Sequence, residues 1–263
     1  MSKWDEFLAQ GWTSFAYSVE LAKWATHARR AAQKAIADPA NAHWHQCEGT
    51  WFVGVEALAN DPVGQVAGSK SLCGPAIAFI KTYIGALPPL HRAQLSVISP
   101  GYPRPRAGES DAAFGYRQRR DAAHIDGLLA TGPDRRRKIR EPHSFILGVP
   151  LTNASADAAP LVVWQGSHHI MRAAFTKALA DHDPATWPDV DITEAYITAR
   201  RMIFETCPRV TLPAQPGEAT LLHRLSLHGV APWSDTATAD KDGRMIAYYR
   251  PQMKNVTDWL ARP

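Results

Sequence analysis

The stretch that decides the fold runs from Asp121 to Leu129 and reads DAAHIDGLL. If it forms a strand, alternate side chains share a face, so His124 and Asp126 point the same way, about 6.6 Å apart along the backbone. Two side chains held in this way can be neighbouring ligands of one metal ion. A third ligand must come from a segment distant in sequence, and His228 is the candidate. Two histidines and one carboxylate on one side of a divalent ion leave the opposite positions open, which is typical of non-haem Fe(II) sites.

The His-Ile-Asp triplet is by itself weak evidence for a metal site. The chain has 11 histidines and 25 acidic residues among 263 positions, so about one His-x-acid triplet is expected by chance. Its meaning therefore depends on the segments around it.

The composition indicates one β-rich domain in a reducing compartment. With 263 residues and 45% hydrophobic side chains, the chain can bury a substantial core. Cys47, Cys73 and Cys207 are odd in number and lack metal or redox spacing, which argues against a disulfide framework. Neither a signal peptide nor a stretch long enough to span a membrane is recognisable. We therefore expect a cytoplasmic protein that does not bind membranes.

Positive charge is concentrated on both sides of the triplet, although the net charge is only +4. The residues concerned are Arg117, Arg119, Arg120, Arg135, Arg136, Arg137, Lys138 and Arg140. Such runs are usually solvated loops. The functional alternative is attraction of an anionic small-molecule substrate. Nucleic acid is a weaker candidate, because no RNA-binding motif or recognition helix accompanies the charge.

The hydrophobic pattern changes from helical to β-like after Leu90. Helices are expected from Ser18 to Ile36 and from Pro75 to Leu87. Short strands, separated by Gly and Pro, are expected at Gln94 to Ser99, Ala122 to Asp126, Ser144 to Leu151, Leu161 to Trp164, Arg209 to Leu212, Ala219 to Arg224 and Arg244 to Arg250. This spacing favours a barrel or a sandwich, with a helical insertion at Ile170 to Phe204.

Four segments in a fixed order carry a family resemblance. They read DAAHIDGLL (121–129), APLVVWQGSHHIMR (159–172), PGEATLLHRLSLHGVAPW (216–233) and GRMIAYYRP (243–251). The set resembles the phytanoyl-CoA dioxygenase family of Fe(II)/2-oxoglutarate oxygenases. Two departures stand out, since Gln165 replaces a common proline and Trp233 a common asparagine.

The resemblance implies a mainly β protein with packing helices, built on a double-stranded β-helix of the cupin-like, jelly-roll type. Residues 1–263 would form one domain, with 1–90 as mainly helical support, 91–251 as the core and an insertion at about 170–205. It assigns iron to His124, Asp126 and His228, and the cosubstrate 2-oxoglutarate to Arg244. The implied reaction is an O2-dependent hydroxylation that releases succinate and CO2, because halogenating relatives replace the carboxylate that Asp126 retains.

Several alternatives stay open at this stage. Arg250 shares a strand face with Arg244, and a bidentate guanidinium at either position could bind the far carboxylate of 2-oxoglutarate; we favour Arg244. His223 is the alternative to His228 as the distal ligand. The side chains expected to line a substrate pocket are Trp51, Tyr116 and Trp164. Other functions to weigh are a catalytically silent, cupin-like metal-binding or regulatory protein and an oxygenase acting on nucleic acid.

Overall fold

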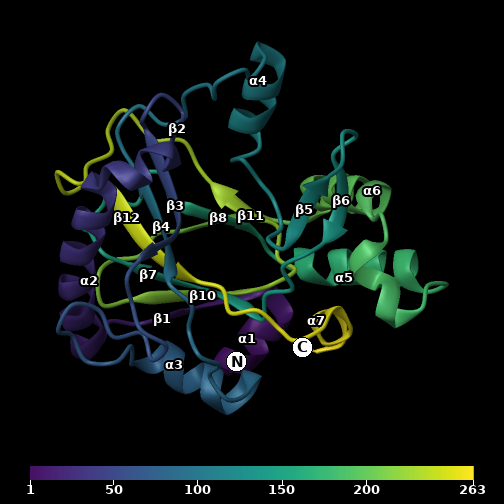
Figure 1. Cartoon of the computed structure of the whole chain (residues 1–263), viewed down its shortest axis with the longest axis horizontal. Helices are drawn as coiled ribbons and strands as arrows, with labels where there is room; N and C mark the ends of the chain where they lie inside the picture. Colours follow the sequence, from purple (N-terminus) through teal and green to yellow (C-terminus); the bar gives the residue numbers. More distant parts are fainter. Residues whose placement is uncertain (263) are drawn as a thin grey trace.

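Two antiparallel sheets face each other in the computed structural model, which describes residues 1–262 (Figure 1). The large sheet has the strand order β1 (Trp12–Phe15), β10 (Ala219–His223), β7 (Phe145–Pro150), β12 (Arg244–Tyr249), β4 (Ala93–Ile98), β3 (Trp51–Leu58) and β2 (His45–Gln46). The small sheet has the order β11 (His228–Val230), β8 (Leu161–Trp164) and β9 (Arg209–Leu212). A separate hairpin joins β5 (Leu128–Thr131) to β6 (Arg136–Ile139).

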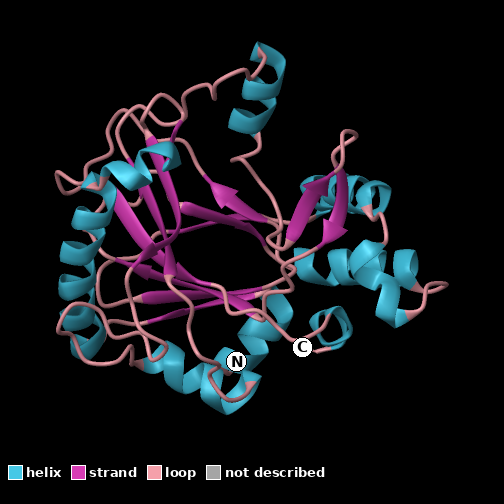
Figure 2. Ribbon diagram, in the orientation of Figure 1, coloured by secondary structure: helices cyan, strands magenta, loops and turns pink. Residues whose placement is uncertain are grey.

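Helices surround the two sheets (Figure 2). They are α1 (Lys3–Gln10), α2 (Val19–Ala37), η1 (Pro39–Trp44), α3 (Pro75–Phe79) with its π-helical continuation η2 (Ile80–Ile84), α4 (Asp111–Arg119), α5 (Ser167–Leu179), η3 (Pro184–Asp189), α6 (Thr193–Thr206) and α7 (Val256–Ala261). The expected helix at 18–36 and the strands at 161–164 and 209–212 are confirmed. The expected helical support at 1–90 also contributes β1, β2 and β3 to the large sheet.

Alternate side chains of β12 pack into two different hydrophobic clusters, one on each face of the large sheet. Met245, Ala247 and Tyr249 pack in the cluster that contains α2 residues such as Trp24. Ile246 and Tyr248 pack instead against Leu161 and Val163 of the small sheet. The even-numbered residues of β12 therefore face the interior between the sheets.

The opposite face of the small sheet is covered by α5 and α6. Val162 and Trp164 of β8 pack there with Phe175 of α5 and Ile203 of α6. These helices come from the segment 167–206, where the sequence predicted a helical insertion. Figure 1 shows α5 and α6 on the side of the molecule opposite to α2.

Candidate metal centre

Three side chains with metal-binding atoms converge where β11 begins. His124, Asp126 and His228 each offer one ligand atom, and these atoms all lie within 4.8 Å of one another. The carboxylate atom Oδ1 of Asp126 is 3.3 Å from Nε2 of His124 and 3.9 Å from Nε2 of His228. The three residues that the sequence singled out as ligands thus form one cluster.

Backbone carbonyls hold both imidazoles in the orientation that a metal requires. The Nδ1 atom of His124 lies 3.0 Å from the carbonyl oxygen of Ala122, and that of His228 lies 2.9 Å from the carbonyl oxygen of Ser226. Because a carbonyl can only accept, Nδ1 carries the proton in each ring. This leaves the lone pair of Nε2 free, directed toward Asp126 and available to an ion.

The segment that carries His124 and Asp126 is positioned by a tight loop rather than by a strand. The predicted strand at 122–126 is wrong, because Asp121 and Ala122 have φ values of 51° and 52° and only His124 pairs with β11, opposite His228. That pairing uses two backbone hydrogen bonds, of 2.8 and 3.1 Å. The two histidines are therefore neighbours across a single bridge, with ring centroids 4.6 Å apart.

Two features hold this loop against β11. The carboxylate of Asp121 accepts hydrogen bonds of 2.7 and 2.8 Å from the guanidinium of Arg209 on β9. A Cβ atom on Gly229 would lie 2.1 Å from the carbonyl oxygen of Asp121, so only glycine permits this approach. The sequence analysis did not identify Asp121 and Arg209 as positioning residues, because their pairing joins segments far apart in sequence.

Arg250 binds the outer oxygen of the candidate carboxylate ligand. Its Nη1 atom donates to Oδ2 of Asp126 at 3.0 Å, and its Nη2 atom donates to Oε1 of Gln94 on β4 at 2.6 Å. Oδ1 of Asp126 is thereby left facing the two histidines. Arg250 is thus already paired, and Gln94 is a further contributor that sequence reasoning missed.

Arg244 lies at the other end of β12 and has no such partner. Its residue is only 6% exposed, and its Nη1 atom is buried without a hydrogen bond. Among residues 1–262 no carboxylate forms an ion pair with it. Since an unpaired buried guanidinium is costly, the site favours an anion from outside the chain.

Burial and neighbouring charges set the protonation of the cluster. Burial would raise the pKa of Asp126, but its contact with Nε2 of His124, which is a hydrogen bond when that ring is protonated, and the charge of Arg250 lower this pKa well below its usual range. Burial, together with the charge of His124, lowers the pKa of His228 to about 4. At neutral pH the cluster therefore offers a carboxylate and a neutral imidazole, which are the forms that bind metal ions.

His223, the alternative distal ligand, points elsewhere. Its Nε2 atom lies 2.9 Å from Nη2 of Arg172, and its Nδ1 atom accepts a hydrogen bond from the backbone of Leu225. Its ring packs beside Phe7 and His168, at centroid distances of 5.9 and 4.8 Å. The structure therefore brings His228, and not His223, to Asp126.

The three aromatic residues expected to line a pocket lie in different environments. Trp51 lies on β3 beside Ile98, the residue paired with Arg244, and donates to the hydroxyl of Ser96. Tyr116 is 45% exposed on α4. Trp164 follows Val163, the partner of His228, so its side chain points to the opposite face, where it packs on Phe204. Trp164 is therefore removed from the candidate lining.

Carboxylates from the insertion neutralise part of the arginine run. Arg136 forms ion pairs with Asp191 and Glu194, and Arg140 pairs with Asp189. The run at 135–140 was interpreted either as a solvated loop or as an attractor of anions. Its internal pairing favours a structural role and weakens the case for an anionic substrate or nucleic acid there.

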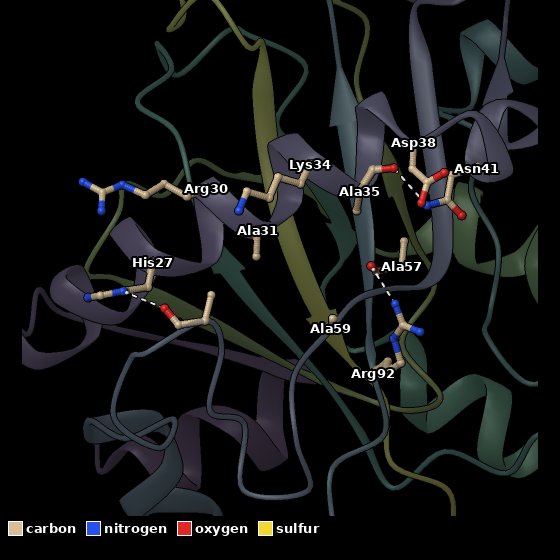
Figure 3. A pocket seen from close by; sticks show the side chains of 11 residues that line it. His27, Arg30, Ala31, Lys34, Ala35, Asp38, Asn41, Ala57, Ala59 and Arg92 are labelled. Carbon is tan, nitrogen blue, oxygen red and sulfur yellow. Dashed lines mark hydrogen bonds between the residues drawn. The ribbon is translucent and has the colours of Figure 1, made fainter.

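A hollow of about 590 Å³ lies outside the sheets, between α2 and the segment around Ala57 and Ala59 (Figure 3). Small alanine side chains form much of its wall, and Arg30 projects away from them. It includes none of the three candidate ligands. We assign no function to this hollow.

No protein-family model and no curated protein sequence matches this chain. Within residues 1–262, no helix combines the length and apolar character needed to cross a bilayer.

Solved structures provide only distant similarities. SnoK, a non-heme alpha ketoglutarate dependent carbocyclase from nogalamycin biosynthesis, has 14% identity over 98% of this chain and 88% of its own, with a TM-score of 0.48. AviO1 from Streptomyces viridochromogenes Tue57 has 13% identity over 95% and 93% of the two chains, with a TM-score of 0.45. EctD from S. alaskensis with bound Fe has 15% identity over 94% and 74%, with a TM-score of 0.43. Because these identities and TM-scores are low, the function of the chain is argued from the geometry of its own site.

Proposed function

We propose that this chain is an Fe(II)- and 2-oxoglutarate-dependent oxygenase whose iron ligands are His124, Asp126 and His228. The observation that carries the proposal is the convergence of the three ligand atoms, with both Nε2 atoms free and directed at one carboxylate oxygen. Two histidines and one carboxylate are the donor set of non-haem Fe(II) oxygenases, which need open positions for cosubstrate and O2.

Arg244 is proposed to bind the far carboxylate of 2-oxoglutarate. By strand parity it faces the interior between the sheets, as His228 does through its pairing with Val163. A guanidinium matches a carboxylate with two parallel hydrogen bonds, and here it would satisfy a buried donor that has no partner in the chain. Arg250, the alternative, is occupied by Asp126 and Gln94.

The protein's own contribution would be to orient the metal ligands and to control access to the metal centre. When bound, iron and 2-oxoglutarate supply the oxidising chemistry by coupling decarboxylation of the cosubstrate to activation of O2. Arg250 holds one oxygen of Asp126 and leaves the other for the ion. The ring of His124 is 47% exposed, which leaves this side of the centre accessible.

The proposal also extends to the fold type, the family, the reaction type and the acceptor molecule. The two facing sheets are proposed to be the halves of a double-stranded β-helix, and the four-segment pattern supports a phytanoyl-CoA-dioxygenase-like member. The retained carboxylate of Asp126 favours hydroxylation. The acceptor is proposed to be a small organic molecule.

The test is 2-oxoglutarate turnover by the full chain loaded with Fe(II). We expect succinate release and O2 uptake that require 2-oxoglutarate, with a loss of at least about 100-fold in His124→Ala and Asp126→Ala. His27→Ala, which changes a half-buried histidine on α2 outside the cluster, is the matched control and should retain wild-type rates.

A second readout does not depend on the unknown acceptor. Anaerobic addition of 2-oxoglutarate to the Fe(II) protein should give the visible charge-transfer band of a chelated 2-oxo acid, and His228→Ala should abolish it. Metal binding without this band, and without turnover for any acceptor, would instead indicate a silent metal-binding protein.

A further inference from the structure

A second cationic site lies between α4 and α6, on the outer side of the small sheet. It is a pocket of about 270 Å³, and its lining includes Arg120, Arg200 and Arg201, with Tyr116 and Phe204 as aromatic walls. Phe204 packs edge-on against Trp164 of β8, with ring centroids 5.1 Å apart, which anchors the pocket floor to the sheet. We call this the α4–α6 pocket.

Two of its guanidiniums are held in place by aromatic rings. The Cζ atom of Arg120 lies 4.4 Å from the ring centroid of Phe204, and that of Arg200 lies 5.3 Å from the same centroid. Arg200 is also within 6 Å of the rings of Tyr116 and Tyr196, at 5.6 and 5.9 Å. Stacking of this kind orients a guanidinium without consuming its hydrogen-bond donors.

These arginines differ from their neighbours in lacking a carboxylate. Arg117 pairs with Glu109, and Arg209 pairs with Asp121. In the described residues 1–262, by contrast, none of the three arginines of the α4–α6 pocket forms an ion pair. The Nε atom of Arg200 is buried without a hydrogen bond. Glu205 is the one carboxylate in the lining, so positive charge is in excess by two.

Such an arrangement is unfavourable unless an anion completes it. Because Arg120 and Arg200 both lie against the ring of Phe204, their charged centres are within about 10 Å of each other, about one Debye length at 0.1 M salt, so they repel at low ionic strength. A carboxylate is satisfied by a single bidentate arginine. Several guanidiniums around one small pocket favour a group that presents oxygens in several directions, as phosphate and sulfate do.

We propose that the α4–α6 pocket binds a tetrahedral oxyanion, the phosphate or sulfate group of a small ligand. The aromatic walls would contact the rest of that ligand. The pocket lies near the metal centre along the chain. Arg120 precedes His124 by four residues, so their Cα atoms are at most about 14 Å apart. The proposal does not depend on the oxygenase activity, because none of the three arginines belongs to the candidate iron or 2-oxoglutarate site.

The experiment is calorimetric titration of the metal-free full chain with inorganic phosphate, sulfate and phenyl phosphate at low ionic strength. We expect saturable binding, tighter for phenyl phosphate than for inorganic phosphate because the aromatic walls add stacking. Arg200→Gln should weaken binding at least about tenfold, the loss of one charge-assisted hydrogen bond. Arg30→Gln removes the same charge from exposed α2 and should leave binding unchanged.

Folding and alternative ligands are tested in the same series. Circular dichroism checks each variant, and Arg201→Gln, an exposed position, gives a second test of the pocket if Arg200→Gln unfolds. Absence of saturable binding by the wild type would overturn the proposal, as would equal weakening by Arg30→Gln. Binding of a single-stranded oligonucleotide that depends on Arg200, without binding of free phosphate or phenyl phosphate, would also overturn it and indicate a nucleic-acid surface.

Discussion

The two ends of β12 carry the same residue in opposite situations. Arg244 begins the strand and is buried, and its guanidinium forms no hydrogen bond or ion pair within residues 1–262, whereas only Nε of Arg250 lacks a partner. Arg250 follows the strand and donates to Asp126 and Gln94. They are six residues apart, about 20 Å along a strand, and both face the interior by parity. One completes the candidate metal centre from within the chain, whereas the other requires a ligand.

The comparison shows what strand alternation can and cannot decide. Alternation predicts that both arginines point inward, but only register determines what each one meets. Arg244 lies opposite Ile98, and the residue before Arg250 in the interior series, Tyr248, lies opposite Gln94. An apolar partner leaves one guanidinium unsatisfied, and a polar partner helps to fix the other.

The largest effect that separates the two arginines is expected for Arg244→Met. The substitution keeps an extended side chain and removes a buried charge, so folding should survive. The far carboxylate of 2-oxoglutarate would then be buried without a partner, at a cost of about 2–5 kcal/mol, or a KM for 2-oxoglutarate raised about 30-fold or more. Steady-state kinetics with saturating Fe(II) measure this KM, and Fe(II) affinity should not change.

Arg250→Gln is expected to give the reverse pattern. Loss of the hydrogen bond to Oδ2 frees the carboxylate of Asp126 to rotate, and outer partners of metal ligands are typically worth about 10- to 100-fold in metal affinity. Competitive titration with a chelating dye measures the Fe(II) dissociation constant. A raised KM for 2-oxoglutarate in Arg250→Gln, with no such change in Arg244→Met, would show that the two roles are exchanged.

Sequence reasoning reached the ligands but not their supports. His124, Asp126 and His228 could be chosen because a short motif, a distal His-Gly and a following strand occur in order. The loop conformation at Asp121 could not be foreseen, since its positive φ depends on Arg209 and Gly229 from distant strands. For the same reason local alternation wrongly predicted a strand there.

Charge patterns in the sequence had a similar limit. The run from Arg135 to Arg140 was compatible with either a solvated loop or an anion site, and acidic residues some fifty positions later neutralise Arg136 and Arg140. The unpaired Arg120, directly after α4, and Arg200 on α6 are separated by 80 residues in sequence. Pairing across such separations is a property of the tertiary fold, which one-dimensional charge counting does not contain.

Gln94→Ala tests the outer end of the Arg250 network and should have a smaller effect. It removes the 2.6 Å hydrogen bond to Nη2 while the ion pair with Asp126 is retained. Because the lost bond acts on the metal ligand only through Arg250, we expect Fe(II) affinity to fall less than about tenfold. An effect as large as that of Arg250→Gln in the same titration would mean that Gln94, and not the ion pair, fixes the guanidinium.

The smallest effect is expected for an arginine–glutamate ion pair that contacts no candidate metal ligand. The hydrogen bond from Arg117 lowers the pKa of Glu109 to about 2. Because the pKa is lower in the folded state, the ionised carboxylate stabilises the protein at pH values above the ordinary glutamate pKa. This stabilisation is lost as the pH falls from about 4.5 toward 2. Glu109→Gln should therefore reduce stability at neutral pH by about 1 kcal/mol at most, with the two proteins converging near pH 2 in thermal unfolding scans. A difference in stability that stays constant at all pH values would mean that Glu109 stabilises the protein through packing and not through its charge. The presence or absence of an ion pair would then be a poor guide to the difference between Arg250 and Arg244.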